Sequence, residues 1–394
     1  MKRCFIYCFL LAFIFCPLFA NIKTQNKGDF KIYYRQINLN HMSPYFDYEG
    51  RYKIPAQLAK GVNHFCFTYK NNKLVSIQEI GTHYSWLIHP LLLIGANKIE
   101  YSYQARKRIA RYYDANGKPT PNYKGIYVEE TLYNKNGRKT GLKYFDYKGK
   151  PMQGIWNISE YHWQYNDSLV IETRKDLQGD SVDVSPYFPF RISGFEIDPV
   201  KHTVVQYNLD KNLHIINSSQ GIAYYRDKEN DRKDQLFWDY YDAKGMKIHP
   251  YGYNKGENIF DKNGYLCRIN FCIGNDIPGY DIFIYNKNGN VVSYKSVWNG
   301  TEQKVATGDN IIDVKVAGEV KPAFIDTVSH AIKIYVPKGS DISYIKPHIR
   351  ISQGAVVHPA SDIPVDFSNG AVKYEVIAQN TVFSKTWNIE VMNR

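Results

Sequence analysis

Cysteine is scarce in this sequence. The chain has six cysteines in 394 residues, and three of them lie within the first twenty residues. Cys66, Cys267 and Cys272 remain, which excludes a fold held by several disulfides and allows one bridge at most. Cys267 and Cys272 would point to opposite faces of a strand. We therefore expect buried, mostly free thiols, and the question of which one could pair with Cys66 stays open.

Long apolar runs are absent after the first twenty residues. Those twenty residues begin with Lys2 and Arg3, continue as an apolar run and end at Ala20, which is typical of an export signal. Cys16 follows large apolar residues instead of the small residues of a lipoprotein signal. A later apolar run, residues 86–94, is too short to span a bilayer. We expect an exported protein of the periplasm or cell surface, without a lipid anchor or a membrane span in the mature chain.

The sequence also lacks the common hydrolase, metalloprotease and nucleotide-binding signatures. Glu129 and Glu130 are adjacent and would face opposite ways on a strand, although a catalytic carboxylate pair from distant strands stays open. His64 and Cys66 could share a strand face, but no second pair of zinc ligands has matching spacing. We predict no metal, no cofactor and no assigned catalytic residue, and we favour a protein that is not an enzyme.

A five-residue motif, an aromatic residue followed by Asp or Asn, two further residues and Gly, occurs seven times. The aromatic residue is expected to end a strand, the Asp or Asn to bond the backbone ahead of it in a type I turn, and the Gly to adopt a positive φ. Each copy therefore predicts a hairpin tip. The copies begin at Phe46, Tyr113, Tyr133, Phe145, Tyr241, Phe260 and Tyr285.

The spacing of the copies is irregular, and the sequence between them reads as short strands separated by turn residues. With 34 Tyr and an aromatic content of 15%, the composition favours strands over helices. We predict an all-β hairpin-repeat region over residues 21–305, built as a meander or solenoid-like sheet, with a subdivision near residues 155–235. The segment Ser185–Arg191 is interpreted as a bend between sheets or subdomains.

The formal net charge is +12, and nearly all of the excess lies before residue 310. A diffuse excess of this kind is typical of a solvated surface, and the alternative is attraction to an anionic polysaccharide or a membrane surface. Nucleic acid is not expected as a partner of an exported chain.

From Ile311 onward the alternation of apolar and polar residues sharpens. About six short strands in some 85 residues, separated by turns, predict an immunoglobulin-like β-sandwich over residues 310–394. This segment has no cysteine, so side-chain packing alone must hold its two sheets together.

The same segment resembles the bacterial Ig-like repeat modules of exported proteins of the Bacteroides group. Such modules are spacers or adhesion domains, so the resemblance implies no catalytic residue. The repeat region resembles, with less regular spacing, the YD-type and MORN-like β-hairpin repeats of bacterial surface proteins. The residues that carry the first resemblance are Pro322–Asp326, Ile332–Asp341, Ile351–Ala355, Val357–Ser361, Asp366–Phe367 and Tyr374–Ala378.

Aromatic side chains are the remaining functional signal. Trp156, Trp163, Trp238 and Tyr240 are the candidate ligand-binding residues, with Trp298 as a further ring, because aromatic faces stack on the apolar C–H faces of sugars. The alternative is that these rings only fill the thin core of a repeat sheet. We predict an exported, non-catalytic binding or scaffolding protein of the bacterial envelope, whose ligand is a glycan or another envelope protein. The alternative function is a secreted carbohydrate-active hydrolase with carboxylates on the repeat sheet. The oligomeric state stays open.

Overall fold

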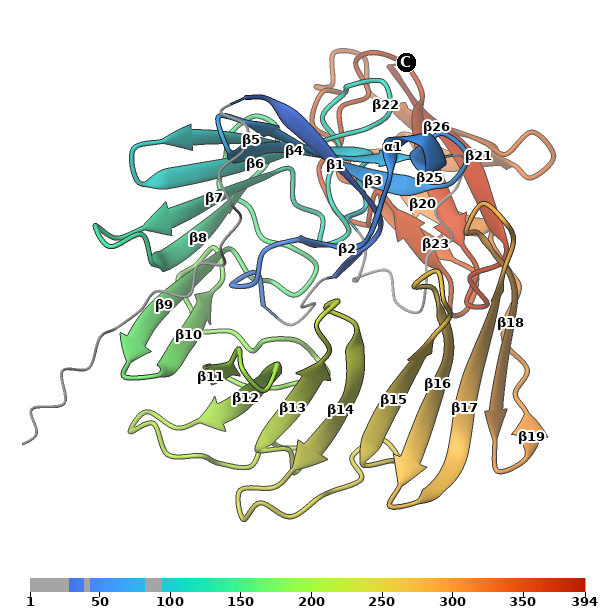
Figure 1. The fold of residues 1–394 in the computed structure, drawn as a ribbon. Coiled ribbons are helices and arrows are strands. Elements are labelled where there is room, and N and C mark those ends of the chain that lie inside the picture. The colour runs from blue at the N-terminus through green and yellow to red at the C-terminus, as the bar shows by residue number, and fades with distance from the viewer. Residues whose placement is uncertain (1–27, 39–42, 82–93, 394) are drawn as a thin grey trace, which may run out of the picture.

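The computed structural model describes residues 28–38, 43–81 and 94–393, and nearly all of its regular structure is β-strand (Figure 1). The fold is all-β, as predicted. One short helix, α1 (Ala56–Ala59), occurs in the described residues. The export signal and most of the apolar run 86–94 lie outside them.

Nineteen strands form one antiparallel sheet. They are β1 (Phe30–Asn38), β2 (Glu49–Ile54), β3 (His64–Lys70), β4 (Lys73–Ile80), β5 (Lys98–Gln104), β6 (Lys107–Tyr113), β7 (Val128–Tyr133), β8 (Lys139–Phe145), β9 (Glu160–Asn166), β10 (Leu169–Lys175), β11 (Ile192–Asp198), β12 (Thr203–Leu209), β13 (Tyr224–Glu229), β14 (Gln235–Tyr241), β15 (Lys255–Phe260), β16 (Leu266–Ile273), β17 (Asp276–Tyr285), β18 (Val291–Trp298) and β19 (Thr301–Glu302).

The sheet is a meander. From β3 onward each strand pairs with the next one along the chain, and β1 lies between β2 and β3. The strands of residues 155–234 belong to this same sheet. Figure 1 shows the sheet curving round, so that its first strands approach the hairpins of its second half. Strand pairing leaves the sheet open.

Six of the seven motif copies form the predicted turn. Asp114 is an example, because its Oδ1 accepts the backbone N–H groups of Asn116 and Lys118 at 2.9 and 2.8 Å. Gly117 has a φ of +77° and donates to the carbonyl of Asp114. The side chain thus completes the turn.

The copy at Phe46 was predicted wrongly. Gly50 lies inside β2 without a positive φ, and the ring of Tyr34 occupies the space where a Cβ would project, 2.2 Å from the nearest ring atom. Asp47 forms ion pairs with Arg108 at 2.7 Å and Lys139 at 2.8 Å. Here the motif residues serve tertiary contacts instead of a turn.

Turns at one end of the strands reveal a regular repeat. The residues Asp114, Asp146, Asp176, Asp210 and Asp242 follow one another at intervals of 32, 30, 34 and 32 residues. Each begins a long connection in which the N–H six residues after the Asp donates to the carbonyl two residues before it. These bonds are Thr120 to Tyr112, Met152 to Tyr144, Val182 to Arg174, Ile216 to Asn208 and Ile248 to Tyr240. The motif spacing is irregular in sequence because the short hairpin turns at the opposite end interleave with this series.

The long connections fold over one face of the sheet, which we call the inner face. Four of the five place one apolar side chain against it at intervals of 32 residues, namely Ile126, Ile158, Phe190 and Ile222, which are 0–3% exposed, and the fifth has Asn254 at the equivalent position. The four apolar residues belong to the two main inner-face core clusters. The segment Ser185–Arg191 is part of such a connection, between β10 and β11, and not a bend between sheets.

The C-terminal residues form two further sheets around one core. One sheet pairs β20 (Ile311–Lys315) with β23 (His348–Ile351). The other has the order β21 (Lys321–Asp326), β22 (Ala331–Val336), β26 (Ser384–Asn393), β25 (Val372–Ile377) and β24 (Val356–His358). Trp387 and Tyr374 are fully buried between the sheets, so packing holds them without a disulfide.

This sandwich is docked on the connections of the long sheet. The hydroxyl of Tyr127 donates to the carbonyl of Pro364 at 2.8 Å, and that of Tyr147 to the carbonyl of Ser343 at 2.6 Å. Ile363 enters a core cluster of the long sheet. The three described cysteines, Cys66, Cys267 and Cys272, are free thiols. Cys66 and Cys272 are buried, as predicted, whereas Cys267 is only partly buried. Among the described helices, none has the length and apolar character needed to cross a bilayer.

Candidate functional site

An aromatic row crosses the inner face of the last strands. The pairing register places Trp238 of β14, Phe271 of β16 and Trp298 of β18 in one line across the sheet. Gly256 of β15 and Gly279 of β17 stand between them in the same line. We call the three rings together with Tyr253 the aromatic row. Large side chains thus alternate with positions that have none.

The glycines allow the tryptophan rings to lie flat on the sheet. A Cβ on Gly256 would stand 2.1–2.5 Å from three ring atoms of Trp238, and one on Gly279 would stand 2.5–2.7 Å from three ring atoms of Trp298. Each indole therefore lies across the backbone of the neighbouring strand. Flat rings present one π-face to the sheet and the other away from it.

The remaining rings extend this surface. Phe271 stacks on Trp298 with 5.1 Å between ring centroids and an interplanar angle of 17°. Tyr253 lies 4.9 Å from Phe271. All four side chains of the row are half-buried. The arrangement is a continuous aromatic strip and not a set of isolated rings.

The row stays partly exposed because of the connection that follows β16. Earlier long connections carry an apolar residue onto the inner face, as Ile222 does between β12 and β13. Between β16 and β17 only Gly274 and Asn275 stand outside the strands. The preceding long connection, between β14 and β15, reaches Phe271 and Trp298 through Tyr253, at 4.9 and 6.5 Å between ring centroids, and in the described part of the chain no long connection after β16 adds a further residue over them.

Two carboxylates flank the row on the inner face. Asp227 is paired with Trp238 in the register and accepts a hydrogen bond from Gln235 at 2.7 Å, and burial raises its pKa to about 7. Asp281 lies opposite Ile269 and Ser296, and burial likewise raises its pKa. Four strand spacings separate β13 from β17, about 19 Å along the sheet. This exceeds the separation of roughly 5–9.5 Å in glycosidase carboxylate pairs, so these two do not form one.

The structure distributes the four predicted site residues over different environments. Trp238 belongs to the aromatic row and donates through Nε1 to the hydroxyl of Tyr240 at 3.0 Å. Tyr240 itself is 5% exposed and lies in a core cluster. Trp163 is 2% exposed, and Trp156 is half-buried against the same cluster as Trp163. The four residues are not brought together on one surface.

Trp163 takes part in a buried polar network. Its Nε1 donates to Glu172 at 2.8 Å, and Glu172 also accepts hydrogen bonds from Ser43 and Arg174. Ser43, Glu172 and Arg174 have no exposed surface. Arg174 stands in the repeat position that Tyr112, Tyr144 and Tyr240 occupy elsewhere. The network anchors the segment that precedes β2 against the inner face, and it offers no access to a ligand.

Phe271 and Tyr253 are site residues that sequence reasoning missed. The pairing register that aligns them follows from the fold and cannot be read from irregular turn spacing.

A separate cleft of about 490 Å³ lies where the sandwich meets the long sheet. Tyr127, Tyr147, His358 and Glu375 are among its lining residues. His358 stacks near Tyr123 with 4.9 Å between ring centroids, and burial lowers the pKa of its imidazole to about 4. Across the residues with a described position, no three His, Cys, Asp or Glu side chains gather as a metal site.

Comparison with protein families gives one match. Residues 311–391 match the family model for the N-terminal domain of SGBP, a family of surface glycan-binding proteins of the Bacteroidetes. The match coincides with the segment for which the sequence predicts a Bacteroides-group module. It covers the C-terminal sandwich and not the long sheet. No curated protein matches the chain.

Solved structures give partial likenesses. A candidate glycoside hydrolase from Bacteroides thetaiotaomicron is 24% identical over 24% of this chain and 28% of its own, with a TM-score of 0.21. TcdB2–TccC3 is 10% identical over 80% of this chain and 14% of its own, with a TM-score of 0.20. A porin-like protein from Bacteroides uniformis is 10% identical over 74% of this chain and 91% of its own, with a TM-score of 0.15. At these scores the likenesses carry no functional argument.

Proposed function

We propose that this chain is an exported, non-catalytic glycan-binding protein of the bacterial envelope, and that the aromatic row is its sugar-binding surface. In this proposal residues 21–305 form the ligand-binding part. Residues 310–394 form an Ig-like domain that spaces or orients it. The envelope location is supported by the export signal expected from the sequence and by the family of the C-terminal segment.

The observation that carries the proposal is the flat placement of Trp238 and Trp298 over facing glycines. Sugars present apolar C–H faces that pack on such rings, while their hydroxyls need polar neighbours. Asp281 supplies a carboxylate beside the row. Rings buried for packing alone would be covered on both faces, whereas these four are half-buried.

Glycan binding by the chain without residues 1–20 tests the proposal, first on a glycan array and then by calorimetry with the ligands found. Trp298→Ala and Phe271→Ala should each weaken binding by roughly 5- to 30-fold, because one stacked ring contributes about 1–2 kcal/mol. Phe383→Ala is the matched control, since Phe383 is 50% exposed and lies outside the row. It should leave the affinity unchanged.

Folding of each variant is checked by circular dichroism and thermal unfolding, because Phe271 also packs against a core cluster. A change in tryptophan fluorescence when glycan binds the native chain gives a second readout that needs no variant. The proposal fails if no glycan binds the native chain. It also fails if the two ring variants fold normally and bind as well as the control.

A further inference from the structure

The strands that carry the aromatic row keep their basic residues on one face. β13 to β18 contain five basic residues, which are Arg226, Lys228, Lys255, Arg268 and Lys295. The register pairs Arg226, Asp239 and Lys255 in one line, and Arg268, Ile282 and Lys295 in another. Lys228 pairs with Phe237. All of these positions have the parity opposite to the aromatic row, so they project from the outer face.

The inner face of the same strands carries acidic groups instead. Asp227 stands in the line of the aromatic row, and Asp281 stands two residues from Gly279 on β17. The Oδ1 atom of Asp281 is buried and accepts no hydrogen bond from the described residues. A buried acceptor of this kind is usually satisfied, so a donor from a ligand would complete its bonding.

Two arginines of the first strands reach this part of the sheet. Arg35 of β1 donates to the hydroxyl of Tyr265 at 3.2 Å. The guanidinium of Arg51 lies 4.9 Å from the ring centroid of Phe260, but it is held by Asp234 at 2.7 Å. Phe260 is four residues along β15 from Gly256, about 13 Å from the row. Tyr265, the partner of Arg35, is six residues from Phe271, about 20 Å along β16. Both arginines therefore lie toward the β15–β16 hairpin and leave the acidic character of the row unchanged.

We infer that the aromatic row binds glycans made of neutral or amino sugars and rejects glycans made of uronic acids. The inference rests on the proposed function of the row. A uronate carboxylate over the row would stand between Asp227 and Asp281 without a cation to pair with. Like charges repel more strongly in a half-buried site than in water, whereas hydroxyl and amino groups can donate hydrogen bonds to these carboxylates.

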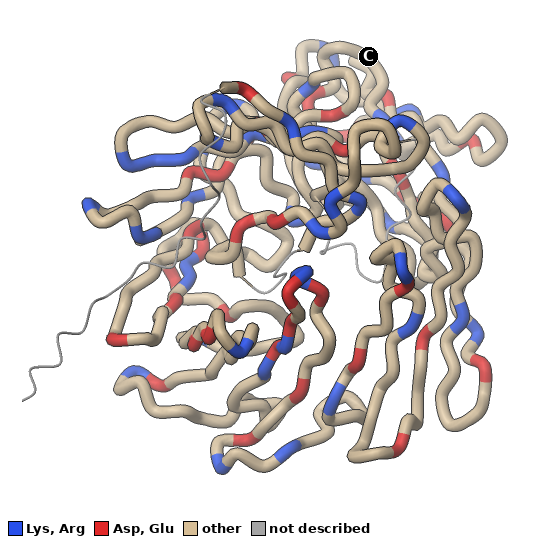
Figure 2. Tube along the Cα trace, in the orientation of Figure 1, with Lys and Arg blue, Asp and Glu red and all other residues tan. Residues whose placement is uncertain are grey.

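This specificity is the reverse of what the net charge of +12 indicates for the whole chain. Figure 2 shows basic and acidic residues spread along the long sheet and not gathered in one patch. The overall excess therefore describes the chain as a whole and does not describe this face.

The test compares three soluble polymers on the chain without residues 1–20, namely a neutral β-glucan, chitosan oligomers and polygalacturonate. Measurements are made at pH 8, because the pKa of Asp227 is about 7 and the carboxylate must be ionised. The neutral or the amino-sugar polymer should bind at least tenfold more tightly than polygalacturonate. Asp227→Asn with Asp281→Asn should narrow this difference at least fivefold, and Trp298→Ala should weaken the preferred polymer.

Outer-face cations could also attract polygalacturonate. The double variant Lys255→Gln with Arg268→Gln removes two of these outer-face cations and leaves the row unchanged. This variant should abolish any residual polygalacturonate binding. Polygalacturonate binding that equals the neutral polymer and falls with Trp298→Ala would overturn the specificity while leaving glycan binding intact. Absence of binding to all three polymers and across the glycan array would overturn the proposed function, and this inference with it.

Discussion

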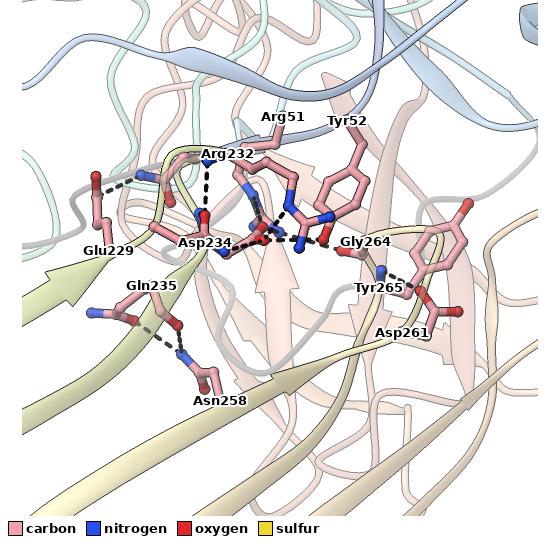
Figure 3. A network of polar contacts seen from close by, with 12 residues as sticks. Arg51, Tyr52, Glu229, Arg232, Asp234, Gln235, Asn258, Asp261, Gly264 and Tyr265 are labelled. Carbon is pink, nitrogen blue, oxygen red and sulfur yellow. Dashed lines mark hydrogen bonds and ion pairs between the residues drawn. The ribbon is translucent and has the colours of Figure 1, made fainter. Parts of the chain in front are cut away.

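Replacing Asp234 by alanine should open the contact that holds the first strands of the sheet against its later hairpins. Asp234 directly precedes β14, and its carboxylate forms an ion pair with Arg51 of β2 at 2.7 Å (Figure 3). It also accepts from the hydroxyl of Tyr52 and the side-chain amide of Asn230, each at 3.0 Å. Arg51 donates further to the carbonyl of Gly264 at 3.3 Å.

The expected loss of stability in Asp234→Ala follows from the burial of the two charged side chains. The side chain of Asp234 is 1% exposed and that of Arg51 is 10% exposed. Removing one partner of a buried pair leaves the other charge unpaired and costs about 3–5 kcal/mol. Replacing both partners by apolar residues of similar size, with Asp234→Leu and Arg51→Met together, should cost much less, because no buried charge is left unpaired. Arg232, which also pairs with Asp234 at 3.6 Å, is 65% exposed and stays solvated.

Hydrogen exchange of the β2 backbone amides is the direct assay, because a repeat sheet of this length can open locally without unfolding as a whole. Loss of 3–5 kcal/mol should speed exchange in β2 by roughly 100- to 4,000-fold. Glu302→Gln serves as the control, since it removes an exposed pair with Lys295 that should contribute under about 1 kcal/mol. An acceleration below about fivefold in Asp234→Ala would refute the closing role of this ion pair.

Three further predictions concern the repeat and the docked sandwich. Ile158→Ala should lower the free energy of unfolding by about 2–5 kcal/mol, measured by chemical unfolding, because Ile158 is 3% exposed. The control Ile215→Ala should lower it little, because Ile215 is 42% exposed. Equal effects would contradict the packing of the long connections against the inner face. Gly137→Ala should lower the free energy of unfolding by about 1–2 kcal/mol. The cause is the φ of +75° alone, because no atom stands near the new Cβ. Thermal unfolding measures the loss, with Gly28→Ala as the control. The pKa of His358 lies at about 4, below the ordinary 6.5, so the stability from its neutral form is full above pH 6.5 and falls by roughly 3 kcal/mol as the pH drops to about 4. His358→Asn should flatten this dependence in thermal unfolding between pH 7.5 and 4, and an unchanged slope would exclude His358 as its source.

Local features of this fold were predictable from the sequence. The strand Lys98–Gln104 alternates polar and apolar residues, and six turns carry a side-chain acceptor and a glycine that fix their geometry without help from the rest of the chain. The copy at Phe46 shows the limit of such reasoning. There the same residues are used by Lys139 and Arg108, which are distant in sequence, and tertiary contacts override the local turn preference.

For the candidate site, the sequence predicted the type of residue but not which of these residues are exposed. Aromatic binding residues were expected, and Trp238 is part of the row, but Trp163 is enclosed by its bond to Glu172. Exposure depends on which connections fold over which strands, and composition does not contain that information.

The sequence by itself determined that this chain is a β-meander with a C-terminal sandwich, because strand alternation and turn chemistry act over a few residues. Only the tertiary structure decided that the turns repeat every 32 residues or so, that β2 reaches back to Asp234, and that Trp238, Phe271 and Trp298 share one line. Register and sheet curvature are set by contacts between strands far apart in the chain. The charge of the inner face follows from the same register, which is why a basic protein carries an acidic aromatic row.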